Sequence, residues 1–352
     1  MSRFALLSGV VCVIALAAPC AAAPPTEGQA YPDSLPLGTL HVDAIAEANF
    51  RVLATTDDPN AKVKVDAPAF VKVLKSDTDA KPGFVTVEIA IDTSKAGEFK
   101  GEIVVSYDKT VVKVPASATV KARKAGAPRV LVVGTPFEAY SADTGTIYKG
   151  WTDVVSAAGL DVSYLLVRND QRNLLRDLDL TKFHSVLVTC GALVLQTPAD
   201  VKRLRAYAEN GGRVVVATAA FCTGSVKGAN AILDGYGLEM LNQEPPPAVK
   251  EITLAKDDFA AELIKAGVGT VAFFRASPIE VQNGGRVLVN AAGYGKPELG
   301  LVAAAKAGKG EVIALGTPLW WYWVSEGQGK GQAKGSDNAK LLGWLLAPSS
   351  NG

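Results

Sequence analysis

The pattern of the sequence changes near residue 128, and this change constrains the fold more than any other feature. Before it, from Leu37 to about Lys121, apolar residues alternate with polar ones, and Val, Ile, Thr and Phe are frequent. That period-two pattern predicts half-buried β-strands. After it, Arg129–Gly134 is a continuous apolar run, which is typical of a strand buried on both faces. The chain therefore divides into an all-β part and an α/β part.

Short strands separated by turn signals, without helical periodicity, predict an immunoglobulin-like β-sandwich over residues 35–121. The stretch around Asp108–Lys109 predicts a hairpin between the last two strands. This part contains no Cys, so packing must stabilise it. The basic residues 122–128 read as a solvated linker. The expected strands are Ala48–Ala54, Ala61–Asp66, Val71–Ser76, Phe84–Ile91, Glu98–Tyr107 and Thr110–Val120.

Residues 129–348 predict a flavodoxin-like α/β domain, in which buried strands alternate with helices in a doubly wound sheet. The expected core strands are Arg129–Gly134, Val162–Val167, Ser185–Thr189 and Arg213–Thr218. The expected helices are Lys149–Ala158, a helix from Pro198 to Asn210, Gly228–Tyr236, and Asn338–Leu346 with Asp337 as its cap. An antiparallel extension is expected from Glu251–Leu254, Val271–Phe274, Ile279–Gln282 and Val287–Ala291, and a last strand pair from Val302–Ala305 and Glu311–Gly316.

The first 22 residues have the three parts of a secretory signal peptide. Arg3 is their sole charge, Phe4–Ala18 is apolar, and small residues close the segment. The alternative is a lipoprotein signal acylated at Cys20, but Pro19 stands where such signals want a small residue. We therefore expect an exported protein, periplasmic or extracellular.

Charge and metal-ligand content exclude several function classes. Removing Arg3 with the signal leaves 35 basic side chains against 35 acidic ones, which gives no electrostatic footprint for nucleic acid. No later segment predicts a transmembrane anchor. The spacing of Cys190 and Cys222, with only His184 in the same half of the chain, matches no zinc pattern. We expect neither a metal nor a cofactor.

Three phrases give the second part a family resemblance. They are RVLVVGTPFE, RLRAYAENGGRVVVAT and GKGEVIALGTPLWW with DNAKLLGWLL. Together they resemble the class I glutamine-amidotransferase-like superfamily, especially its non-amidotransferase, trehalose-utilisation-like branch. In the first part, LGTLHVDAIAEANFRVLA and AGEFKGEIVVSY resemble the immunoglobulin-like modules of exported bacterial proteins, which implies a spacer or adhesive role.

The departures from the superfamily concern its catalytic residues. Active amidotransferases carry a nucleophilic Cys in the turn after the strand equivalent to Arg213–Thr218. Here Ala219 and Ala220 occupy that turn and Cys222 comes late. The His-x-Glu pair that the resemblance implies is replaced by Thr317–Trp320. Because a thiol needs a base to act as a nucleophile, we expect no amidase activity.

Ligands of open parallel sheets bind beyond the carboxyl ends of the strands. The alternative for each polar residue there is an ordinary loop residue that hydrogen-bonds to its own backbone. Cys190 and Cys222 form a disulfide, remain as two buried thiols or act as a reactive pair. Trp321 and Trp323 either fill the core or form a stacking platform for a ligand. The candidate ligand residues are Glu138, Tyr140, Asn169, Asp170, Cys190, Cys222, Trp321 and Trp323.

The leading hypothesis is a non-catalytic exported protein that binds a protein or a small molecule, a carbohydrate among the choices, at the strand ends. The sandwich then serves as a spacer. One alternative is a carbohydrate- or amide-directed hydrolase that uses Glu138 and Asp170. Another is an envelope scaffold in which both parts make only protein contacts.

Overall fold

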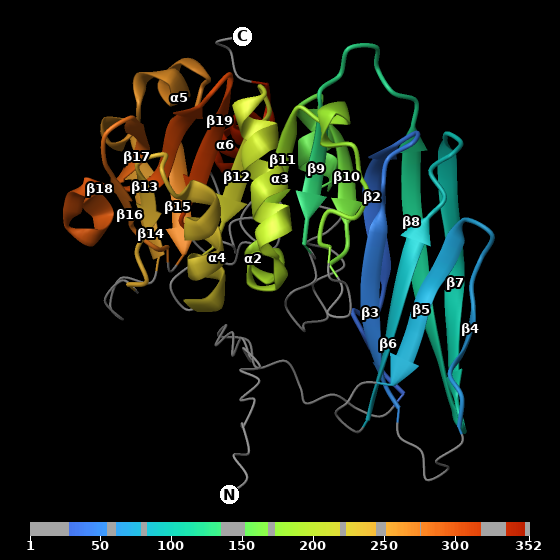
Figure 1. Ribbon diagram of the computed structural model, residues 1–352. Coiled ribbons are helices and arrows are strands. Elements are labelled where there is room, and N and C mark those ends of the chain that lie inside the picture. The colour runs from blue at the N-terminus through green and yellow to red at the C-terminus, as the bar shows by residue number, and fades with distance from the viewer. Residues whose placement is uncertain are drawn as a thin grey trace, which may run out of the picture.

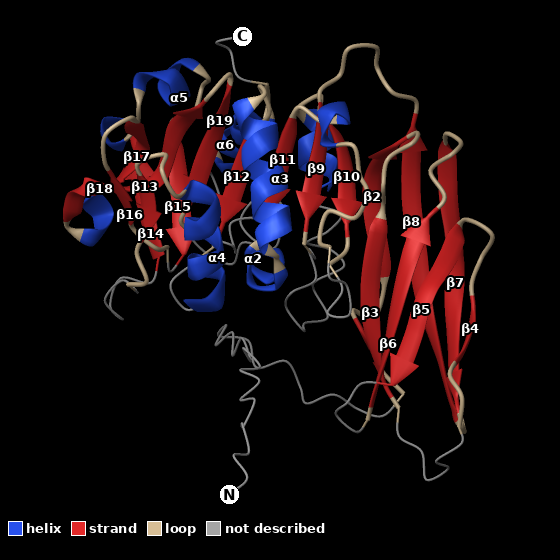
Figure 2. Ribbon diagram, viewed as in Figure 1, coloured by secondary structure: helices blue, strands red, loops and turns tan. Residues whose placement is uncertain are grey.

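A computed structural model describes residues 28–54, 61–78, 83–134, 152–167, 173–218, 223–243, 251–274, 276–317 and 336–348. In these ranges a β-sandwich, blue to green in Figure 1, lies beside a larger α/β unit, green to red. The helices lie on the α/β unit (Figure 2). In the part of the chain that the structure describes, no helix has the length and apolar character needed to cross a membrane.

Two four-stranded sheets form the sandwich, and their inward residues share one core. Val87 and Ile89 of one sheet and Ile103 and Val105 of the other are buried, as the period-two pattern predicts. The first sheet has the order β1 (Ala30–Tyr31), β3 (Glu47–Leu53), β6 (Phe84–Ile91) and β5 (Val71–Thr78). The second has the order β2 (Leu35–His41), β8 (Thr110–Lys121), β7 (Gly97–Tyr107) and β4 (Lys64–Asp66).

Six of these strands lie where the alternation predicts them, and the β7–β8 hairpin turns at Asp108–Lys109. The strands β1 and β2 were not among the expected segments. The first has only two residues, and Pro36 and Gly38 interrupt the second, where they obscure its strand propensity. The strand β2 pairs in parallel with β8.

Nine strands form the sheet of the α/β unit, in the order β10–β9–β11–β12–β19–β18–β16–β13, with β17 on β18. Counted along the chain, the five parallel strands have the order 2-1-3-4-5. They are β9 (Arg129–Val133), β10 (Asp161–Leu165), β11 (Ser185–Val188), β12 (Arg213–Ala217) and β19 (Gly310–Leu315). The antiparallel strands are β13 (Leu238–Met240), β16 (Ile279–Val281), β17 (Gly285–Ala291) and β18 (Lys296–Ala307). A separate pair joins β14 (Glu251–Ala255) to β15 (Thr270–Phe274).

Helices cover both faces of the parallel strands, which explains why these strands read as continuous apolar runs. On one face α2 (Cys190–Leu195), α3 (Pro198–Glu209) and α4 (Thr223–Leu233) pack on residues such as Leu131 and Val186. On the other face α6 (Asn338–Leu346) and the helical residues 152–157 pack on residues such as Val130 and Leu187. Short elements complete the unit: α5 (Ala261–Lys265), η1 (Leu180–Lys182), η2 (Lys256–Asp258) and η3 (Ala292–Tyr294).

Several elements differ from the sequence expectations. The helix α2 was not expected, and β18 is far longer than Val302–Ala305. Asp337 is the N-cap residue of α6, as predicted, but its side chain makes no capping hydrogen bond to this helix. Its carboxylate instead accepts hydrogen bonds from the backbone N–H groups of Gly269 and Thr270, at 2.7 and 3.2 Å. These amides begin the strand beside the helix, so the carboxylate ties α6 to β15.

The sandwich packs against β10, the edge strand of the large sheet (Figure 1). The N–H of Tyr164 donates to the carbonyl of Ile45 at 2.7 Å, and the N–H of Ile45 donates to Ser163 Oγ at 3.1 Å. Residues of both units, Phe50 and Tyr164 among them, belong to one hydrophobic core. Backbone pairing and a shared core therefore hold the two units as one body.

A buried ion pair crosses the same junction. Glu47 on β3 accepts two hydrogen bonds from the Arg176 guanidinium, at 2.7 and 2.8 Å, and a third from the N–H of Leu166 at 3.1 Å. Arg123, in the basic stretch 122–128, donates to the Asp161 carboxylate at 2.7 Å. Charged groups of the α/β unit and the stretch leading into it thus supply specific contacts at the junction.

Candidate functional site

Hydroxyl and thiol groups gather at the carboxyl edge of the parallel sheet. Cys190 begins α2 directly after β11, Thr218 follows β12, and Ser225 lies on α4. The Cys190 thiol donates to Ser225 Oγ at 3.1 Å, and the Thr218 hydroxyl contacts both Ser225 Oγ and the Cys190 sulfur. All three side chains are buried. This cluster fixes the strand-to-helix turns beneath the edge where ligands of such sheets bind.

Cys190 forms no disulfide with any residue in the described ranges. Its sulfur lies against two hydroxyl groups, and no positive charge is among these contacts to stabilise a thiolate. This surrounding matches a buried structural thiol. Its pairing with Cys222 in an oxidised protein stays a prediction, because Cys222 lies outside the described residues.

Of the eight candidate ligand residues, Cys190 is described, and the structure brings it together with Thr218 and Ser225. The other seven lie outside the described residues, so their convergence at the carboxyl edge stays a prediction. They are Glu138, Tyr140, Asn169, Asp170, Cys222, Trp321 and Trp323.

Both histidines of the chain lie at the opposite, amino edge of the sheet. His184 directly precedes β11, and its Nδ1 accepts the backbone N–H of Arg129 at 3.1 Å. His41 Nδ1 lies 3.4 Å from the carboxylate of Asp161, the first residue of β10. Burial lowers the pKa of His41, with Lys121 and Arg123 acting in the same direction and Asp161 opposing them. Each imidazole thus has a structural contact far from the carboxyl edge.

The amino edge also carries a depression of about 850 Å³. It is bounded by Phe183 before β11, by Tyr207 on α3, and by the β18–β19 turn with Lys309. Tyr207 donates its hydroxyl to the Phe183 carbonyl at 3.0 Å, and burial raises the pKa of this phenol. Positively charged side chains line much of the remainder: Arg203, Arg213, Arg286, Lys306 and Lys309.

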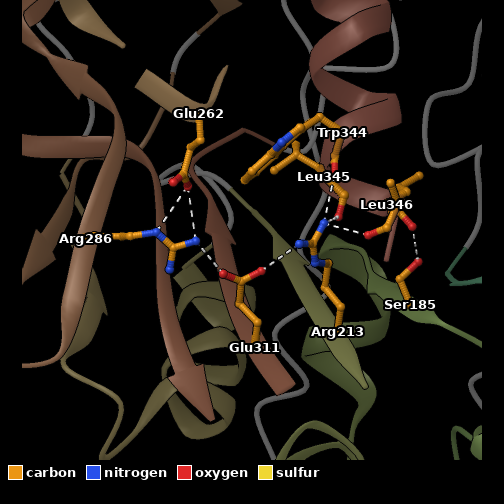
Figure 3. A network of polar contacts seen from close by, with 9 residues as sticks. Ser185, Arg213, Glu262, Arg286, Glu311, Trp344, Leu345 and Leu346 are labelled. Carbon is orange, nitrogen blue, oxygen red and sulfur yellow. Dashed lines mark hydrogen bonds and ion pairs between the residues drawn. The ribbon is translucent and has the colours of Figure 1, made fainter. Parts of the chain in front are cut away.

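A network of ion pairs (Figure 3) contains three residues that line this depression, Arg213, Arg286 and Glu311. The buried Glu311 carboxylate lies between two guanidinium groups, 2.9 Å from Arg213 and 2.6 Å from Arg286. Arg213 also donates to the last carbonyls of α6, at 2.8 Å to Trp344 and 2.6 Å to Ala347. Positive charge at a helix C-terminus is favourable, so this network joins α6 to the sheet.

The pKa values of the two arginines move in opposite directions. Burial lowers the pKa of Arg213, against the attraction of Glu311. Burial acts on Arg286 in the same direction, but its hydrogen bonds and charge pairing with Glu311 and Glu262 outweigh it and raise the pKa of this group. Both groups stay charged at neutral pH, because a guanidinium group is not deprotonated in proteins.

No cluster of three or more His, Cys, Asp or Glu side chains suited to a metal ion occurs in the described ranges. At the amino edge Glu311 lies between two arginines, and Asp179 accepts its hydrogen bonds from Thr181. The arrangement therefore offers hydrogen-bond donors and positive charge rather than metal ligands.

The sequence analysis placed the candidate site at the carboxyl edge. It did not identify the ion pairs of Arg213 with Glu311 and of Glu47 with Arg176. A signal for two of these residues was present. Arg213 precedes Val-Val-Val-Ala, and Glu311 precedes Val-Ile-Ala-Leu, so each is a charge at the start of a buried strand. Such a charge must find a partner at the strand end.

Comparison with known proteins adds little to this geometry. No protein-family model matches the chain, and no curated protein sequence does. A β-galactosidase from Bacillus circulans sp. alkalophilus is similar over 63% of this chain and 32% of its own, at 13% identity and a TM-score of 0.41. A β-galactosidase from Rahnella sp. R3 is similar over 64% of this chain and 32% of its own, at 12% identity and a TM-score of 0.40.

The VesB protease of Vibrio cholerae is similar over 25% of this chain and 30% of its own, at 18% identity and a TM-score of 0.17. The chain thus spans about a third of the length of each of these structures. At such TM-scores the likenesses carry no argument about fold or function.

Proposed function

We propose that this chain is an exported binding or interaction protein without acyl-transfer chemistry, which takes its ligand at the carboxyl edge of the parallel sheet. We also propose that residues 129–348 form a flavodoxin-like domain of the class I glutamine-amidotransferase-like superfamily. The strand order 2-1-3-4-5 supports this assignment. Residues 35–121 are proposed as an immunoglobulin-like sandwich that acts as a rigid spacer, which its shared core with the α/β unit supports.

The position of the two histidines is the observation that carries the proposal. A thiol or hydroxyl nucleophile at the carboxyl edge requires a base within hydrogen-bond reach. The imidazoles of His41 and His184 are the histidine bases of this chain, and both make contacts at the amino edge. The whole length of the parallel strands separates them from Cys190 and Thr218.

The first experiment tests the absence of amidotransfer. Purified full-length mature protein is incubated with glutamine, and released ammonia is measured for the wild type, Cys190→Ser and Cys222→Ser. We expect the same background rate in all three proteins, because both imidazoles of the chain make their contacts at the amino edge. Ammonia release that Cys222→Ser abolishes would overturn the proposal.

The second experiment tests ligand binding at the carboxyl edge. Neutral mono- and oligosaccharides are titrated while tryptophan fluorescence is recorded. We expect a spectral change that Trp321→Ala and Trp323→Ala remove, because stacking on an indole is the contact proposed for a sugar. Trp344→Phe is the matched control, since Trp344 lies over Arg213 at the amino edge, 5.3 Å from guanidinium carbon to ring centroid.

Two results would contradict this part of the proposal. One is sugar release from an oligosaccharide that Glu138→Gln or Asp170→Asn abolishes, which establishes a hydrolase instead. The other is a spectral change that persists in both tryptophan variants and disappears in Trp344→Phe, which places the ligand at the amino edge.

A further inference from the structure

The lining of the depression at the amino edge has a larger excess of basic over acidic side chains than the whole chain has. Its lining contains five basic side chains and two acidic ones, whereas the whole chain has a formal net charge of +1. This local excess is a property of the fold, because the lining comes from segments between Leu178 and Pro348 that are far apart in the sequence.

Both acidic side chains of the lining are already engaged. Glu311 is buried between Arg213 and Arg286. Asp179 accepts hydrogen bonds from the hydroxyl and the backbone N–H of Thr181, at 2.6 and 3.1 Å, and these bonds lower the pKa of its carboxyl. The lining carboxylates therefore do not compensate the remaining cations.

Two of the basic groups are also committed to the fold. The guanidinium of Arg203 donates to the carbonyls of Arg176 and Leu178, and that of Arg213 donates to the end of α6. Lys306 and Lys309 differ from them, since Lys306 is exposed near the end of β18 and Lys309 is exposed in the β18–β19 turn. The guanidinium of Arg286 is paired with Glu262 and Glu311, at 3.1 and 2.6 Å, and its side chain remains 41% exposed.

His184 adds a hydrogen-bond donor to the same lining. Its Nδ1 accepts the N–H of Arg129, which leaves Nε2 as the donor of this ring. The apolar part of the lining comes from Leu180, Phe183 and Tyr207. A depression of about 850 Å³ with apolar walls and a few convergent polar groups has the dimensions of a small-molecule site.

We propose that this depression binds a small phosphomonoester, with Lys306, Lys309 and the exposed edge of Arg286 around its phosphate. A phosphate monoester carries about two negative charges at pH 7 and three acceptor oxygens, which matches an excess of several cations better than a single carboxylate does. Lysine serves phosphate as a mobile point charge, and this fits two exposed amines beside a turn. The site lies at the sheet edge opposite to the one used in the proposed function and is independent of it.

The test is isothermal titration of the full-length mature protein with glucose 6-phosphate at low ionic strength. Glucose and inorganic phosphate are separate arms that distinguish the sugar from the phosphate. We expect glucose 6-phosphate to bind and glucose not to bind at the same concentrations. Raising the ionic strength from about 0.02 to 0.2 M should weaken binding, since salt screens exposed charges.

The double variant Lys306→Gln/Lys309→Gln should weaken binding about tenfold, the combined effect of two solvent-screened charge contacts. Lys306→Arg/Lys309→Arg keeps the charges and should retain binding. Lys72→Gln/Lys100→Gln removes two exposed lysines of the sandwich and serves as the matched control. The proposal fails if neither glucose 6-phosphate nor inorganic phosphate binds, or if the Lys306 and Lys309 neutralisation leaves the affinity equal to that of the control.

Discussion

Replacing Glu47 with Gln tests whether the sandwich and the α/β unit are one folding body. The substitution preserves the shape of the side chain and removes its charge. In the folded protein Glu47 is buried and accepts two hydrogen bonds from Arg176 and one from the N–H of Leu166. The variant therefore removes the negative charge that Glu47 presents to the guanidinium of Arg176 at the junction.

The expected loss follows from the burial of the two partners. Removing one member of a fully buried ion pair costs about 3–5 kcal/mol. The side chain of Arg176 is 29% exposed, so water recovers part of that cost, and the amide oxygen can still accept the N–H of Leu166. We expect the free energy of unfolding to fall by about 2 kcal/mol. For a chain of this size the melting temperature falls by about 4 °C.

Thermal and urea unfolding followed by circular dichroism measure this loss. Asp66→Asn is the matched control, because it removes the charge of an exposed pair with Lys64 whose side chains are 72% and 59% exposed. That variant should change the free energy of unfolding by less than about 0.5 kcal/mol. Arg176→Met combined with Glu47→Gln should cost less than the sum of the single changes, because it removes the uncompensated charge.

Two outcomes would refute the reasoning. In one, Glu47→Gln costs no more than Asp66→Asn, which means that the ion pair does not contribute to the junction. In the other, the wild-type protein unfolds in two separate transitions and Glu47→Gln shifts neither of them, which means that the sandwich and the α/β unit do not depend on each other.

Two further predictions concern the edges of the large sheet. Gly134 has φ +143°, and a Cβ there would overlap the Thr189 hydroxyl. Gly134→Ala should therefore lower the free energy of unfolding, measured by urea titration, by about 2 kcal/mol or more. An unchanged urea midpoint would contradict the packing described. Because burial holds the pKa of His41 below its ordinary value of 6.5, the unfolded chain takes up a proton there more readily than the folded one, and stability should fall as the pH drops below about 6.5. His41→Gln should lessen that fall in melting temperatures measured from pH 7.5 to 5; an identical pH profile in both proteins contradicts it.

Local periodicity predicted many of the regular elements. The helix Asn338–Leu346 and the strand Phe84–Ile91 have the predicted bounds, because their apolar residues recur with the helical and the strand period. The helix Cys190–Leu195 was missed, since its six residues are too few to show a helical period beside an apolar strand. The seven-residue strand β2 was missed for a different reason, because Pro36 and Gly38 interrupt its alternation.

The contacts between distant segments were not predictable in this way. Glu47 and Arg176 are 129 residues apart, and nothing in the pattern of either neighbourhood selects the other. Asp337 takes the predicted N-cap position, but the bonds of its carboxylate to Gly269 and Thr270 were not predictable, since these residues become its neighbours only after the sheet forms. Seven of the eight candidate ligand residues lie outside the described residues, so that part of the site stays a prediction.

A single feature of the parallel strands connects these observations. Polar residues stand at or beside their starts, at Arg129, Asp161, Ser185, Arg213 and Glu311, whereas their last residues are apolar. Partners for the buried charges must then be found at the amino edge, where Asp161 meets Arg123 and His41, and Glu311 meets two arginines. Those contacts lie at the end of the strands opposite to Cys190 and Thr218. The buried charges at the starts of the strands thus tie the amino edge of the sheet to the sandwich through His41 and to the end of α6 through Arg213.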